Sequence, residues 1–194
     1  MSHLVIAEVS QFLRHVLWLG LQDAEDTRQL ITGETDIVLS NPAEPVTGAK
    51  RLLSLWLYQI LPNEHLRNPD MVRRRDQKDD AAQFYPPLVV NLLYLLTPST
   101  ADDLGDQKVL GRALQIFHDQ SVLRMETVAN PGRAEELHVS LAPRTIEELA
   151  EVWEAMQKPY RLSVCYEVRA VRIDSTRRLA AGRIADRQSE LAEA

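Results

Sequence analysis

The chain has 194 residues, of which 45% are hydrophobic and 26% are charged, as is usual for a soluble globular protein with a substantial core. Its formal net charge of −6 argues against nucleic acid as the main partner, because phosphate binding requires a basic surface. The only cysteine, Cys165, excludes a disulfide within the chain. The length predicts one domain with an appendage rather than two domains.

The N-terminal residues do not resemble a targeting segment. Glu8 and Arg14 interrupt the first apolar run, which also lacks a basic leader and a small-residue cleavage site. No stretch approaches the roughly 20 apolar residues that a membrane-spanning helix needs. A single cysteine is typical of a protein that folds in a reducing compartment. We therefore expect assembly in the cytoplasm and no membrane among the partners.

Residues 4–20 follow the spacing of an amphipathic helix. At about 100° per residue, Trp18 falls among the polar residues of the opposite face. We expect another part of the chain or a partner to cover this side chain, which makes Trp18 a candidate interface residue. The expected buried stripe consists of Val5, Val9, Phe12, Val16 and Leu19, widened by Ile6, Leu13 and Leu17.

Two long apolar runs predict the centre of a sheet. Residues 51–61 are apolar on both faces, which favours a strand that is buried on both sides. Residues 88–96 predict a central strand, although a buried helix of this length fits the same pattern. A shorter strand is expected at residues 36–39, between glycine- and proline-containing stretches.

The two apolar runs are joined by a charged connection, residues 63–84, that is longer than most connections in compact domains. Arg73, Arg74 and Arg75 form a basic run within it, and Asp76, Asp79 and Asp80 follow at once. Such a run is typical of a solvated loop. The alternative is contact with an acidic neighbour in a ring, which makes the three arginines candidate interface residues.

The second half of the chain predicts two helices and a strand between them. Asp102 or Asp103 caps a helix that runs to about Gln120, and a strand is expected at residues 137–141. Thr145 and Glu148 form a capping box, which predicts a helix that ends at Pro159. Its expected buried stripe consists of Ile146, Leu149, Val152, Trp153 and Met156.

Apolar and polar residues alternate from Tyr160 to Val168, which predicts a strand with one buried face. The alternation changes phase near Ala170 and continues to Ile173, so we expect a β-bulge or a change of neighbour there. This strand is expected in the centre of the sheet. The predicted fold class is α+β, with one mixed β-sheet flanked by helices.

The chain after Asp174 has few large apolar groups, so we expect residues 1–174 to form the domain and residues 175–194 to form an arm or a tail. A tail would have no contacts, whereas an arm would become ordered on a partner. Its charged side chains suit exposed ion pairs, and the candidate interface residues within it are Arg177, Arg178, Arg183 and Arg187.

No pattern of residues predicts catalysis or cofactor binding. Cys165 with His118 or His138 would be needed for a small hydrolase, yet Cys165 lies within a predicted strand and has no nucleophile motif. The five histidines lack metal-ligand spacing, and the glycines form no phosphate-binding pattern. We therefore expect no catalytic, cofactor-binding or metal-binding residues.

Several segments in this order resemble the cap proteins of virulence-cassette and antifeeding-prophage injection particles. They are LYQILPNEHLRN from Leu57, PPLVVNLLYLLTP from Pro86, LGRA from Leu110 with Phe117-His118-Asp119, and Trp153 followed by PYRLSVCYEVRAVRID. The resemblance extends from the first helix to Asp174. This chain is shorter than family members that carry an added C-terminal region.

These cap proteins are similar to phage tail terminators, and the resemblance implies a structural role in a contractile injection system. It implies a homohexameric ring that closes the end of the inner tube and anchors the last layer of sheath. The implied partners are other copies of the chain, the inner-tube protein and the sheath protein. Two other classes remain open: a monomeric adaptor or recruitment module, and the small hydrolase.

Overall fold

The computed structural model describes residues 3–44, 52–66, 72–75, 81–128 and 130–177. Its α-helices are α1 (Val5–Gln22), α2 (Glu25–Leu30), α3 (Asp103–Asp119) and α4 (Ile146–Ala155), with 3-10 turns at Glu34–Asp36 and Glu64–Leu66. Its strands are β1 (Ile37–Val38), β2 (Leu53–Pro62), β3 (Val72–Arg75), β4 (Ala81–Phe84), β5 (Leu88–Pro98), β6 (Val122–Thr127), β7 (Asn130–Leu141) and β8 (Val164–Ile173).

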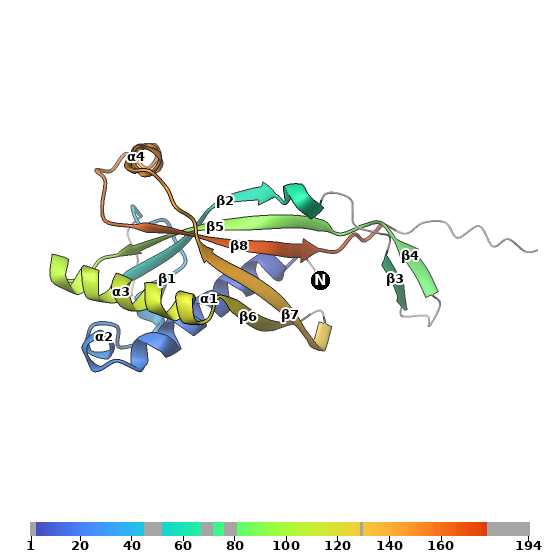
Figure 1. Ribbon diagram of the computed structural model, residues 1–194, viewed down its shortest axis with the longest axis horizontal. Helices are drawn as coiled ribbons and strands as arrows, with labels where there is room; N and C mark the ends of the chain where they lie inside the picture. Colours follow the sequence, from blue (N-terminus) through green and yellow to red (C-terminus); the bar gives the residue numbers. More distant parts are fainter. Residues whose placement is uncertain (1–2, 45–51, 67–71, 76–80, 129, 178–194) are drawn as a thin grey trace, which may run out of the picture.

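Six of these strands form one mixed sheet in the order β1-β2-β5-β8-β7-β6. β1 and β2 are parallel, whereas the other neighbours in this sheet are antiparallel. The helices α1, α2 and α3 lie on one side of the sheet and α4 lies on the other (Figure 1). This arrangement confirms the predicted α+β class and the central position of the last strand.

The two apolar runs form β2 and β5, so the helix alternative for residues 88–96 is wrong. β5 is buried along nearly all of its length, but β2 is buried only from Leu53 to Leu55 and is exposed from Gln59 onward. The prediction that both faces of β2 are buried is therefore wrong for its second half. The reason is that α4 packs on Trp56 and Tyr58 and covers only the first half of the strand.

The main hydrophobic core lies between the sheet and the two long helices α1 and α3. Leu13, Leu17 and Leu21 are at most 1% exposed and form the centre of the buried stripe of α1. Leu19, which we expected on that stripe, is 49% exposed. The buried stripe of α1 is rotated away from Leu19, because α1 packs against α3 as well as against the sheet. Leu13 and Leu17 belong to the core that these elements share.

Gly20 marks a close approach of α1 to α3, because a Cβ atom there would lie 2.5 Å from Ile116 Cδ1. Ile116 is 4% exposed, and its Cγ1 atom would also lie 2.5 Å from the added Cβ. We expect Gly20→Ala to lower the free energy of unfolding by about 1–3 kcal/mol in urea denaturation, the usual cost of overpacking. Gly111→Ala on α3 is the matched control, because nothing lies within 4 Å of its added Cβ. That variant should gain up to about 1 kcal/mol of stability from helix propensity. Equal gains in both variants would contradict a tight contact at Gly20.

The capping box at the start of α4 is confirmed. The backbone N–H of Thr145 donates to Glu148 Oε2 at 2.9 Å, and the backbone N–H of Glu148 donates to Thr145 Oγ1 at 3.3 Å. The helix ends at Ala155, earlier than Pro159, and Gln157 adopts a positive φ of 56° after it. Ile146 is 62% exposed, contrary to the predicted stripe, because the helix rests on the sheet through Leu149 and Trp153.

The remaining differences concern the strands. The charged connection was predicted as a loop, but it contains the two-stranded sheet β3–β4. β6 was not predicted, and β7 begins at Asn130, before the expected residues 137–141. β8 begins only at Val164, because Tyr160 and Leu162 are exposed and lie outside the sheet.

The predicted bulge near Ala170 is confirmed by the register of β5 and β8. Leu92 pairs with Val168 and Val90 pairs with Val171, so two residues of β8 lie opposite the single residue Asn91. Ala170 has a φ of 61°, a left-handed conformation that the bulge imposes on a non-glycine residue. The bulge explains the change of phase seen in the sequence.

Candidate functional site

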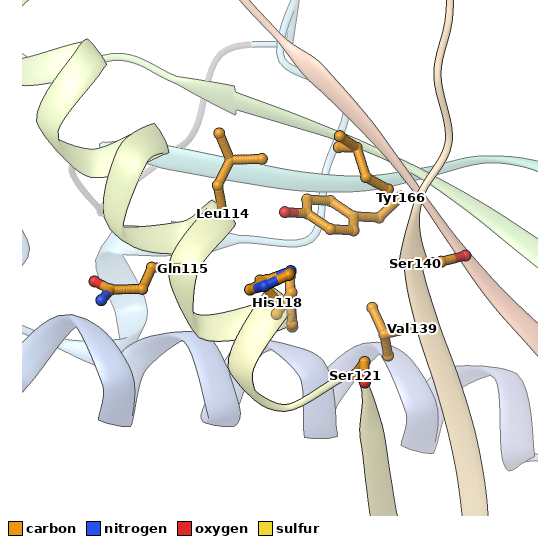
Figure 2. A pocket seen from close by; sticks show the side chains of 9 residues that line it. Leu114, Gln115, His118, Ser121, Val139, Ser140 and Tyr166 are labelled. Carbon is orange, nitrogen blue, oxygen red and sulfur yellow. The ribbon is translucent and has the colours of Figure 1, made fainter.

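A hollow of about 630 Å³ lies between α3 and the strands β7 and β8 (Figure 2). Its walls are mostly apolar and include Leu114, Phe117 and Val139, with His118 on α3. Tyr166 reaches into the space from β8, and burial raises the pKa of its phenol to about 12. This hydroxyl group therefore stays protonated at neutral pH. The hollow contains apolar surface but no nucleophile paired with a base.

The cysteine–histidine pair that a hydrolase would need is not brought together. Cys165 is 3% exposed and lies under α4, where the hydroxyl of Tyr58 donates to its sulfur at 3.7 Å. Burial raises the pKa of the Cys165 thiol, which keeps it protonated and unreactive. His118 lines the hollow beside α3, and His138 pairs across the sheet with Arg169. Over the part of the chain that the structure describes, no three His, Cys, Asp or Glu side chains gather as metal ligands.

A polar groove of about 370 Å³ lies where β2 ends, and Asn91 of β5 and Glu167 and Arg169 of β8 also line it. The side-chain amide of Asn63 donates to Asn91 Oδ1 at 2.9 Å, and Asn91 Nδ2 donates to Glu167 Oε1 at 2.8 Å. Arg169 Nε donates to the other oxygen of Glu167 at 2.7 Å, and the backbone N–H of Ala170 donates to Asn91 Oδ1 at 3.3 Å. This network joins β5 and β8 to the residue that follows β2, and Asn91 Oδ1 accepts two hydrogen bonds in it, so it fixes the bulge.

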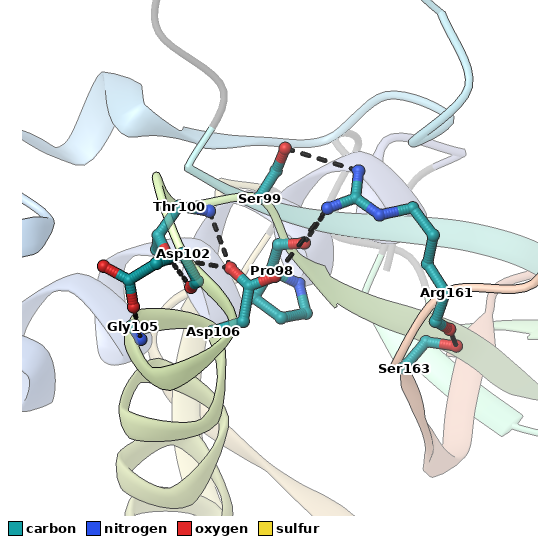
Figure 3. A network of polar contacts seen from close by, with 8 residues as sticks. All are labelled: Pro98, Ser99, Thr100, Asp102, Gly105, Asp106, Arg161 and Ser163. Atoms are coloured by element: carbon teal, nitrogen blue, oxygen red, sulfur yellow. Dashed lines mark hydrogen bonds and ion pairs between the residues drawn. The ribbon is translucent and has the colours of Figure 1, made fainter.

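A second polar network ties the loop after α4 to the start of α3 (Figure 3). Arg161 donates to the carbonyl oxygen of Pro98 at 3.3 Å and lies 3.7 Å from the carboxylate of Asp106. Asp106 Oδ1 in turn accepts from the backbone N–H and the hydroxyl of Thr100, at 2.7 and 2.8 Å. Asp102 caps α3 by accepting from the backbone N–H of Gly105 at 2.7 Å. These contacts stiffen the end of the molecule rather than form a site for chemistry.

Trp18 packs against the edge of its own main core and is half buried. Its ring centroid lies 5.7 Å from that of His15, and its indole N–H is buried without a hydrogen-bond partner in the described chain. The subunit itself thus covers part of this side chain. Contact between Trp18 and a partner stays a prediction.

The candidate arginines are distributed over two regions. Arg73, Arg74 and Arg75 lie in β3, opposite β4, but their side chains fall outside the described part of the structure. The guanidinium of Arg177 lies 4.4 Å from the centre of the Tyr85 ring, and its carbonyl accepts from the backbone N–H of Tyr85 at 3.0 Å. The last three candidates, Arg178, Arg183 and Arg187, lie outside the described residues.

No feature of the amino-acid sequence indicated the two open edges of the sheet. β1 pairs only with Leu53 and Ser54 of β2, so residues 55–62 have a strand neighbour on one side alone within the described residues. β6 likewise pairs only with β7. Strand order is not encoded by any local pattern, so these edges become visible only in the tertiary structure. Among the helices described, none is long and apolar enough to cross a bilayer.

Two solved structures resemble this fold. One is the sheath/tube terminator of PVC, an extracellular contractile injection system, in its extended state. It has a TM-score of 0.56 and 17% sequence identity, covering 91% of this chain and 63% of that chain. The other is the tube-terminating cap of the anti-feeding prophage, with a TM-score of 0.46 and 21% identity, covering 64% and 43% of the two chains. This chain therefore spans less than two thirds of the length of either structure.

No curated protein matches the sequence. The model of one protein family, described as the Pvc16 N-terminal domain, matches residues 8–186, which is nearly the whole chain. The chain thus belongs to the Pvc16 N-terminal domain family, which confirms the resemblance to cap and tail-terminator proteins that its sequence predicted.

Proposed function

We propose that this chain is a ring-forming structural subunit that caps the inner tube and anchors the last sheath layer of a contractile injection system. The observation that carries the proposal is its membership of the Pvc16 N-terminal domain family. The likeness to a sheath/tube terminator over 91% of the chain supports the same role at the level of the fold. The partners in this proposal are further copies of the chain in a six-fold ring, the tube protein and the sheath protein.

The chemistry of the described residues supports a structural role rather than an enzymatic one. Cys165 is buried with a raised thiol pKa, and His118 lies in a different hollow. The two polar networks, around Asn91 and around Asp106, stiffen the sheet and one end of the molecule. A subunit that bears load at the end of a tube requires such rigidity. In this proposal assembly takes place in the cytoplasm and involves neither nucleic acid nor a membrane.

Electron microscopy of particles made with and without this chain tests the proposed function. With the chain present, we expect a closed ring at one end of each particle and sheath that extends to this ring. Without it, tubes should lack a defined length and lose their last sheath layers. Capped particles of normal length made without the chain would overturn the proposal. A protein that stays monomeric and is absent from particle ends would instead favour the adaptor.

We further propose that the C-terminal residues form an arm that contacts the sheath or the next cap subunit. Because Arg177 contacts Tyr85, the test removes only residues 178–194 and leaves this contact intact. The truncation should leave the thermal unfolding of the subunit unchanged and reduce the occupancy of the last sheath layer. Exposed ion pairs contribute only about 0–1 kcal/mol each, so several must act together.

A second test of the arm uses a full-length variant in which Arg178, Arg183 and Arg187 are replaced by glutamine, so that only the charges are removed. If charge holds the arm in place, this variant should lose as much sheath as the truncated protein, and raised salt should have the same effect on the unmodified protein. Normal sheath length and occupancy in the truncated particles would show that these residues form only a tail.

A further inference from the structure

The two open edges of the six-stranded sheet lie on opposite sides of the subunit. β2 has ten residues, of which two pair with β1, so eight residues have a free edge among the described parts of the chain. β6 offers six residues at the other side of the sheet. A free edge presents unpaired N–H and C=O groups, which form a template for another strand.

The free edge of β2 has little protection against such pairing. Residues 55–62, LWLYQILP, include no charged side chain, although charged residues usually guard an exposed edge. A register shift at Tyr58 and the proline at position 62 are the only protective features in this stretch. Ile60 and Leu61 are 46% and 38% exposed. An edge of this kind is suited to being covered in an assembly.

The edge formed by β6 lies beside a hollow that an added strand would fill. This hollow, of about 340 Å³, lies between α1 and β6. Its apolar lining residues are Phe12, Met125 and Val128, and its polar or charged ones are Glu8, Gln11, Arg14, His15, Glu34 and Glu126. Val128 is 80% exposed, which is unusual for a large apolar side chain. A strand laid against β6 would direct every second side chain towards α1, into this hollow.

We propose that β2 of one subunit pairs with β6 of the next copy of the chain, so that the sheets join edge to edge around the ring. This inference rests on the proposed function, because the ring supplies the second copy. A contact between two different edges of the same chain is heterologous, and repetition of such a contact closes into a ring when the rotation permits. Ile60 pairs with Leu92 of the main core, so its side chain points to the α1 side and would enter the neighbour's hollow.

The properties of both edges favour a second copy over an unrelated strand. One chain supplies an acceptor edge and a donor edge of similar length, and the pairing leaves neither open within the ring. A foreign strand on β2 would still leave the edge of β6 and its hollow uncovered. The two charged residues of β6 are Arg124, which alternates onto the face opposite Met125, and Glu126, which also lines the hollow. The hollow is therefore apolar at Phe12, Met125 and Val128 and acidic at Glu8 and Glu126.

Disulfide cross-linking in assembled particles tests the contact. Gln59 is exposed and shares a face of the sheet with Val122, Arg124 and Glu126, so Gln59→Cys is combined with a cysteine at each of these three positions in turn. Directly opposed residues on paired strands have Cβ atoms about 4.5–5.5 Å apart, within reach of a disulfide after slight adjustment. We expect one combination to give a ladder of cross-linked subunits that ends at the size of the ring. Each variant with one added cysteine should stay monomeric under denaturing conditions, because the native Cys165 is buried.

The outcomes separate this inference from the proposed function. A ring at the particle end without a ladder from any combination overturns the edge contact and leaves the cap function standing. Dimers from a variant with one added cysteine indicate a two-fold contact, and a product of another mass indicates a foreign strand on this edge. Either result overturns the inference. Absence of the chain from particle ends overturns both proposals.

A charge placed on the edge gives a second test with a matched control. Ile60→Glu would direct a carboxylate towards a hollow that contains Glu8, Glu34 and Glu126 and in which Arg14 already pairs with Glu34 at 3.1 Å. We expect ring assembly to weaken by about tenfold or more. Ile146→Glu makes the same change at a residue of α4 that is 62% exposed and lies on neither edge. It should assemble normally. Equal assembly of the two variants would contradict the role of the β2 edge.

Discussion

Trp153→Ala is expected to lower the free energy of unfolding by about 3–5 kcal/mol, the usual cost of deleting a large buried aromatic side chain. Trp153 is 2% exposed and belongs to a cluster of four buried residues that holds α4 on the sheet. Its indole N–H also donates to Ser163 Oγ at 3.2 Å, a bond between buried groups that the variant removes. Urea denaturation followed by circular dichroism measures the change.

Val152→Ala on the same helix is the control for Trp153, because Val152 is only partly buried against this cluster. The smaller side chain and its partial exposure predict a cost of about 1 kcal/mol or less. If Trp153→Ala lost no more stability than Val152→Ala, α4 would be attached to the sheet by something other than this cluster.

Asn91→Ala is expected to give the second large loss, because each buried polar group left unpaired costs about 1–3 kcal/mol. Asn91 accepts from Asn63 and Ala170 and donates to Glu167, so one substitution affects three partners. The bulge in β8 should loosen as well. Denaturation gives the loss of stability, and hydrogen exchange at the amide of Ala170 reports the loosening.

Glu167→Gln separates the hydrogen bond from the charge in this network. The glutamine keeps an oxygen that accepts from Asn91 Nδ2, and it loses only the ion pair with Arg169, whose side chain is 58% exposed. Such exposed pairs contribute about 0–1 kcal/mol. A large loss in this variant, or none in Asn91→Ala, would contradict the view that the hydrogen bonds of Asn91 hold the bulge.

The sequence by itself determined the features that depend on neighbouring residues. The capping box of Thr145 and Glu148 and the cap at Asp102 were found because a side chain contacts a backbone group three residues away. The bulge at Ala170 was found because a pleated strand alternates its faces, so an extra residue reverses the pattern. The ordered family segments, spread over nearly the whole chain, also predicted membership of the cap family.

Only the tertiary structure decided which surfaces each element covers. Leu19 and Ile146 fit their helical stripes by spacing, yet both are exposed, because the direction from which another element packs is not a local property. Trp18 has a polar position by spacing but packs against the core edge for the same reason. The short strands β3 and β4 escaped prediction because the arginines of β3 and the charged sequence between the two strands satisfy the pattern of a loop equally well.

The same limit applies to the candidate interface. The basic runs were visible in the sequence, but the open edges of β2 and β6 were not, because strand order arises from contacts between residues far apart in the chain. Residues 51–61 were predicted as a strand buried on both sides, because apolar side chains on both faces have the same pattern whether the chain itself or another subunit covers them. Burial within one subunit and burial within an assembly rest on the same hydrophobic effect, so only the position of the strand at the edge of the sheet distinguishes them.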